Sequence, residues 1–158
     1  VPLVPLVSGH ESVFAFAPID PNQPMMNTCA MPMAKVEQPT TLEGHAGVLY
    51  ETPCGESPYL IEGSGDQLTV YLVANGALTM TYEYIHSPVA EGETWLLNGM
   101  VQTWHRVPAP LVTAAGSFDD CWRRSQTDFS LDYCRGAGLV RMRDDTSNYV
   151  LDLVSKNF

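Results

Sequence analysis

The clearest alternation of hydrophobic and polar positions runs through residues 67–86 (QLTVYLVANGALTMTYEYIH). Asn75-Gly76 lies at its centre, and both residues of a tight type I′ turn need positive φ, so this pair predicts a β-hairpin. With that turn, Tyr71 is expected to lie opposite Met80. The face predicted to form a wall of the core consists of Thr69, Tyr71, Val73, Leu78, Met80, Tyr82 and Tyr84. The opposite face, beginning at Leu68, is more mixed.

A second Asn-Gly hairpin is predicted over residues 93–107, with Trp95 opposite Gln102. Short alternating runs predict further strands at 12–17, 47–51, 58–62, 128–133, 139–143 and 148–154. The pattern as a whole predicts an all-β, antiparallel fold, either a sandwich or barrel-like, with nine or ten strands. All 158 residues are expected to form a single β-rich domain.

Two stretches do not read as strands. Residues 1–11 begin VPLVPLV, and prolines at this spacing favour an extended arm. Residues 18–45 are rich in proline and methionine, which predicts an irregular segment lying on apolar surface.

At most one short helix is expected, near residues 117–126. Ser117 would be its N-cap, with Asp120 at the third helical position as in a capping box. Arg123 and Arg124 would then lie at the negative end of the helix dipole.

Charge is distributed unevenly. The net charge is −10, and residues 1–105 contain eleven carboxylates against one lysine, whereas residues 106–158 are balanced. An acidic surface repels nucleic acid and attracts a cationic partner, so we expect no nucleic-acid binding. No apolar run approaches the roughly 20 residues that span a bilayer, so no membrane span is expected.

Four cysteines, Cys29, Cys54, Cys121 and Cys134, lack the spacing of a zinc site. Of the three possible pairings we expect the local one, Cys29–Cys54 and Cys121–Cys134. Disulfides favour an oxidising compartment. The sequence begins at Val1 and contains no glycosylation sequon. We therefore expect a periplasmic or secreted protein from which a signal peptide has been removed.

Catalytic motifs are weak. The histidines are scattered, and Gly63-Ser64-Gly65 precedes a strand, whereas a phosphate loop or a nucleophile elbow leads into a helix. Glu91 and Glu93 could act as an acid–base pair on a sugar, but loop carboxylates are mostly solvated. We expect no catalytic residues, no metal and no cofactor.

By exclusion, the sequence favours a rigid protein-binding module over an enzyme. The leading hypothesis is a periplasmic inhibitor or immunity-type protein that occludes the active site of a basic, cell-wall hydrolase or toxin. The predicted contact residues are Gly116, Ser117, Phe118, Asp119 and Asp120, with Glu91 and Glu93 as second choice.

Two alternatives remain open at this stage. One is a carbohydrate- or cell-wall-binding module that stacks sugars on exposed aromatic side chains, with Trp95 and Trp104 or Tyr71, Tyr82 and Tyr84 as candidates. The other is an extracellular hydrolase whose motifs are not recognisable.

Overall fold

The computed structural model describes residues 1–55 and 57–158, which form strands and no helix. Nothing in this part of the chain is a helix that could cross a membrane. The first seven strands are β1 (Glu11–Pro18), β2 (Met33–Leu42), β3 (His45–Glu51), β4 (Tyr59–Ser64), β5 (Gln67–Ala74), β6 (Ala77–Ile85) and β7 (Thr94–Leu97). The others are β8 (Met100–Arg106), β9 (Leu111–Thr113), β10 (Gly116–Phe118), β11 (Cys121–Gln126), β12 (Phe129–Cys134), β13 (Gly138–Asp144) and β14 (Tyr149–Lys156).

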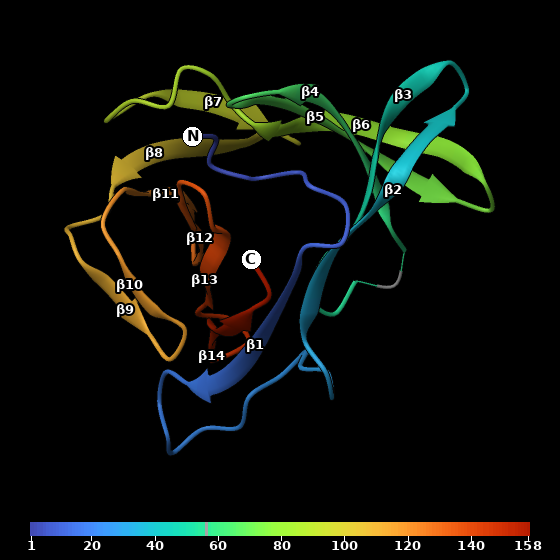
Figure 1. Ribbon diagram of the computed structural model, residues 1–158. Helices are drawn as coiled ribbons and strands as arrows, with labels where there is room; N and C mark the ends of the chain where they lie inside the picture. The colour runs from blue at the N-terminus through green and yellow to red at the C-terminus, as the bar shows by residue number, and fades with distance from the viewer. Residues whose placement is uncertain (56) are drawn as a thin grey trace.

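Twelve of these strands form one nearly closed, barrel-like antiparallel sheet (Figure 1). Its order is β6-β5-β4-β3-β2-β1-β14-β13-β12-β11-β8-β7, so almost every strand pairs with its neighbour in sequence. The first and last strands, β1 and β14, pair with each other and join the two halves of the meander. The sheet's two edges are β6 and β7, while β9 and β10 form a separate two-stranded sheet.

Both Asn-Gly turns form as predicted. Asn75 and Gly76 have φ of 53° and 76°, and Asn98 and Gly99 have φ of 50° and 77°. In the second hairpin, Trp95 pairs with Gln102 in the expected register.

The register of the first hairpin differs from the prediction beyond its turn. A shift between Leu72 and Val73 places Leu72, rather than Tyr71, opposite Met80. The extra residue is Thr79 of β6. Beyond this bulge, the side chains of β6 share a face with the other set of β5 side chains than the one predicted. The buried side chains of β5 are consequently Leu68 and Val70, whereas Met80 is exposed. The predicted core wall of this hairpin was wrong in β5 and at Met80.

The helix expected near residues 117–126 is absent. Residues 116–118 form β10, and residues 121–126 form β11, which pairs with β8 on one side and β12 on the other. A helix of two turns gains little stability by itself, so sheet pairing along both edges outweighs the local capping signal.

The strand count was also too low. The described residues contain fourteen strands rather than nine or ten. Two omissions are the three-residue strands β9 and β10, which are too short to show a period. Another is β2, which lies inside the 18–45 segment predicted to be irregular. Its pairing register with β3 shifts between Val36 and Pro39, and such an irregularity tolerates a residue without an N–H.

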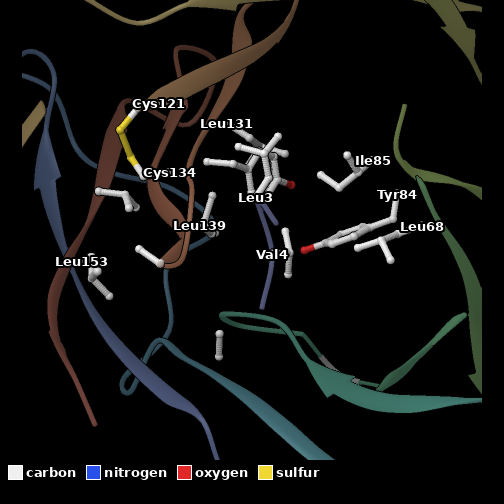
Figure 2. Close-up of a cluster of buried hydrophobic side chains, with 14 of the residues drawn as sticks. Leu3, Val4, Leu68, Tyr84, Ile85, Cys121, Leu131, Cys134, Leu139 and Leu153 are labelled. Carbon is white, nitrogen blue, oxygen red and sulfur yellow. A yellow bond between two sulfur atoms is a disulfide. The ribbon is translucent and has the colours of Figure 1, made fainter. Parts of the chain in front are cut away.

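The N-terminal arm contributes to the core. Leu3 and Val4 are buried, and Figure 2 shows them between Leu131 and Leu139 on one side and Tyr84 and Ile85 on the other. Polar contacts hold the arm at its start. The Leu3 N–H donates to Asp66 at 3.0 Å, and Arg135 bridges Asp66 and the Val1 carbonyl.

Two disulfides are present, Cys29–Cys54 and Cys121–Cys134, in the pairing that was expected. The second joins directly paired residues of β11 and β12. Two disulfides are compatible with an extracellular or periplasmic location.

Side chains of β8 and β11 donate hydrogen bonds to backbone carbonyls at the edge formed by β6. The Trp104 indole N–H donates to the carbonyl of His86 at 2.9 Å. The Arg124 guanidinium approaches the carbonyl of Tyr84, two residues before His86, at 3.5 Å. These donors satisfy edge carbonyls that no strand covers.

Candidate functional site

A cavity of about 330 Å³ lies among side chains of β3, β4, β6, β11, β12 and β13. Its described lining consists of Tyr50, Thr52, Pro53, Cys54, Gly55, Tyr59, Tyr82, Tyr84, Arg124, Phe129, Leu131, Tyr133, Leu139 and Met142. Cavities that bind small organic molecules are of this size, mostly apolar, with a few polar groups.

Five tyrosines dominate the lining, and three of them are buried, namely Tyr50, Tyr84 and Tyr133. Burial raises the pKa of all three phenols above the usual value, because an apolar environment disfavours the charged phenolate. The pKa of the half-buried Tyr82 is raised for the same reason, with a smaller effect from Tyr59. These side chains are therefore neutral at physiological pH and keep their O–H donors.

Arg124 is the one charged residue among the described lining residues. It lies in the middle of β11 and is only 9% exposed. Its hydrogen bond within the described chain is the long one from Nη1 to the Tyr84 carbonyl, and the buried Nε has no partner. Buried charges in proteins are normally paired, because an unpaired one loses its hydration without compensation.

Two other arginines show what such a partner looks like. Arg123 donates from Nε and Nη2 to the two oxygens of Asp132 at 2.7 and 2.9 Å. Arg141 binds Asp152 through the same two nitrogens at 2.6 and 2.9 Å. Successive side chains of a strand point to opposite faces, so Arg123 lies outside the cavity wall and Arg124 inside it. The corresponding nitrogens of Arg124, Nε and Nη2, bind no carboxylate of the described residues.

The charge of the cavity lining therefore has the opposite sign to the net charge of the protein. The chain as a whole has a net charge of −10. The described lining contains one cation, neutral phenols and apolar side chains, and no aspartate or glutamate. The arrangement can hold a negatively charged group by charge-assisted hydrogen bonds and an apolar group by packing.

The predicted contact residues lie elsewhere, and three of them bind other residues of the chain. Glu91 accepts from the Arg106 N–H at 2.6 Å and contacts His105 at 2.9 Å, and these contacts lower the pKa of Glu91. Glu93 contacts His86 at 3.1 Å. Asp120 contacts Arg135 at 3.3 Å.

Pairing of β8 with β11 brings Glu91 and Asp120, one from each group of predicted contact residues, to the same arginine. Arg106 binds Glu91 through its N–H, and its guanidinium approaches Asp120 at 3.8 Å. Glu93, in contrast, contacts the end of β6.

The remaining predicted residues lie on the β9–β10 hairpin. Gly116 and Ser117 are exposed, Phe118 packs against the core, and Asp119 is exposed in the following turn. Ser117 is part of strand β10 rather than a helix N-cap.

The predicted aromatic platform for sugars is not available at the tryptophans. Trp104 is fully buried and Trp95 is 9% exposed. Tyr84 is buried and lines the cavity together with Tyr82. Tyr71 and Tyr82 are only partly buried, so the carbohydrate-binding alternative stays a prediction for these tyrosines, although it loses both tryptophans.

Of the cavity residues, Tyr82 and Tyr84 were predicted only as sugar-stacking candidates and Cys54 only as a disulfide cysteine, and Arg124 was not predicted as a site residue. The five tyrosines of the cavity come from four strands, β3, β4, β6 and β12, so no local spacing marks them. Arg124 could have indicated the site, because arginine is rarely buried and would be unusual on the inward face of a strand. The expected helix concealed that signal.

Comparisons of the chain with family models, with curated proteins and with solved structures give no match.

Proposed function

We propose that the protein binds a small organic molecule in the cavity between β3, β6, β11 and β12, and that it does so outside the cytoplasm. The observation that carries the proposal is the buried guanidinium of Arg124, which has no carboxylate partner among residues 1–55 and 57–158, in a cavity lined by aromatic side chains. An unpaired buried charge is costly to the folded protein, and binding of a ligand is the kind of role for which such a cost is retained.

Binding rather than catalysis is proposed because the described lining offers no general base or activated nucleophile. It contains no histidine and no carboxylate, and Cys54 is held in a disulfide. The two disulfides support the proposed location.

A screen of small organic compounds by ligand-observed NMR tests the proposal. Thr52 lines the cavity, is partly exposed and lies outside the strands, so Thr52→Trp should fill part of the cavity without disturbing the sheet. We expect compounds that bind the wild-type protein and lose binding in Thr52→Trp.

Thr41→Trp is the matched control, because Thr41 is exposed on β2 and does not line the cavity. It should leave binding unchanged. If no compound binds, or if Thr52→Trp binds the same compounds as Thr41→Trp, the proposal fails.

A second candidate function is the protein-binding one, favoured by the β9–β10 hairpin. This hairpin lies outside the twelve-stranded sheet, and its Val112 is 60% exposed beside Ser117 and Asp119. In this proposal the protein is a periplasmic inhibitor or immunity-type protein, and the hairpin enters the cleft of a basic hydrolase.

Inhibition assays with basic cell-wall hydrolases test this second proposal. Ser117→Arg should abolish inhibition at an unchanged melting temperature, because Ser117 is exposed. Gly116 is less suitable for substitution, since its φ of 137° disfavours a side chain. Equal inhibition by wild type and Ser117→Arg would exclude the hairpin as the contact.

A further inference from the structure

We infer that the ligand of this cavity is an organic carboxylate with an aromatic or otherwise apolar body, and that Arg124 binds its carboxylate. The inference rests on the proposed small-molecule function and names the ligand's chemical class. The same class of contact already occurs twice on the outer face of the protein.

The geometry of those two contacts carries the argument. In Arg123 and Arg141, the Nε and Nη2 nitrogens bind both oxygens of one carboxylate at 2.6 to 2.9 Å. In Arg124, Nη1 is directed to the Tyr84 carbonyl, and the described residues provide no hydrogen-bond partner for the other edge of the guanidinium, Nη2 and the buried Nε. A planar carboxylate matches this edge through two parallel hydrogen bonds.

Local electrostatics select the sign of the ligand. The cavity wall supplies one guanidinium and no carboxylate from the described residues, and burial holds its phenols in the neutral form. A cationic ligand would meet Arg124 in a low-dielectric interior and be repelled. A neutral ligand would leave the buried charge of Arg124 uncompensated.

The remaining wall selects the body of the ligand. Phe129, Leu131, Leu139 and Met142 provide apolar contact, and the tyrosine rings provide faces and edges for an aromatic group. A volume of about 330 Å³ lies at the lower end of the range of cavities that hold small organic molecules, so the ligand is a compact one.

Titration with 4-phenylbutanoate and with its neutral isostere 4-phenylbutanamide tests the inference. Both probes have the same size and the same aromatic body, so calorimetry of the two isolates the charge. We expect the carboxylate to bind at least about tenfold more tightly than the amide, because hydrogen bonds between charged groups are the stronger ones.

Arg124→Met should abolish this preference while retaining most of the side-chain volume. It should also raise the melting temperature of the ligand-free protein, since it removes a buried charge for which the described part of the chain supplies no carboxylate. Arg123→Met is the matched control one residue away. Because Arg123 is paired with Asp132 on the other face, its loss should lower the melting temperature and leave the probe preference intact.

The outcomes separate the inference from the proposed function. Equal affinity for the two probes, or no binding of the carboxylate at millimolar concentration, overturns the inference. The compound screen with Thr52→Trp decides the proposed function independently. A lower melting temperature in Arg124→Met would show that the protein itself balances this charge, and would also overturn the inference.

Discussion

The imidazole of His86 lies flat against the indole of Trp95, with ring centroids 4.5 Å apart and planes inclined by 8°. His86 follows edge strand β6, and Trp95 belongs to the other edge strand, β7. The stack therefore joins the two edges that the sheet leaves unpaired. Each ring nitrogen of His86 also contacts a carboxylate, Nδ1 to Glu83 at 2.7 Å and Nε2 to Glu93 at 3.1 Å.

This arrangement predicts a pH-dependent stability. Partial burial lowers the pKa of His86, but the hydrogen bonds to Glu93 and Glu83 outweigh it and raise the pKa above its usual value of 6.5. A raised pKa means that the stabilising contribution is complete below the pKa of the unfolded chain and is lost as pH rises through that of the folded protein. We expect the melting temperature to fall as the pH increases above 6.5.

His86→Gln is the control for this profile. The difference in melting temperature between wild type and His86→Gln should be largest in mild acid and shrink toward alkaline pH. Taking this difference removes the contribution of His10, whose pKa is lowered by burial and by Lys156 and which therefore acts in the opposite sense. A difference that does not change with pH would contradict the assignment.

Asp132 is expected to be the most important carboxylate for stability on the outer face. Its side chain is 1% exposed and accepts two hydrogen bonds from Arg123. Asp132→Asn should lower the free energy of unfolding by about 1.5–3 kcal/mol, measured by urea denaturation. Asp152→Asn, whose side chain is 34% exposed, is the comparison and should cost less than about 1 kcal/mol. Equal losses would show that burial does not govern these pairs.

Leu3 should behave as a core residue although it lies in an arm without secondary structure. It is fully buried between the two walls of the sheet (Figure 2). Leu3→Ala should lower the free energy of unfolding by about 2–5 kcal/mol, the usual range for a buried leucine. Val7→Ala, at a position that is 53% exposed, should change it little. An unaffected Leu3→Ala protein would mean that the arm does not pack inside the sheet in solution.

The Cys121–Cys134 disulfide closes a sequence separation of 13 residues. In the chain-entropy description, a loop of this length corresponds to about 3 kcal/mol of stabilisation through the unfolded state. Replacing both cysteines by alanine should cost about that amount in urea unfolding. Mass spectrometry of freshly purified protein should detect two disulfides, and four free thiols would remove the support for an exported location.

Local patterns predicted much of the fold because hairpins depend on a few adjacent residues. Asn75-Gly76 and Asn98-Gly99 supply the positive φ that tight turns require, and both turns form where the sequence places them. The disulfide pairing also followed from proximity along the chain. The bulge that leaves Thr79 of β6 without a partner in β5 was not predictable, because it depends on how the two strands fit into the folded sheet.

The candidate site lay beyond the reach of local patterns. Ser117 and Asp120 carry a genuine helix-capping signal, yet pairing with β8 and β12 makes residues 121–126 a strand. That strand turns Arg124 into the interior, where Tyr50, Tyr84 and Tyr133 converge on the same cavity from distant parts of the chain. The all-β class, the disulfides, the acidic charge and the two Asn-Gly turns could be predicted from the sequence alone, because they depend on composition and on neighbouring residues. Which face of each strand is buried, and that Arg124 lies inside without a carboxylate from the described residues, emerged only from the folded structure, because both depend on long-range strand pairing.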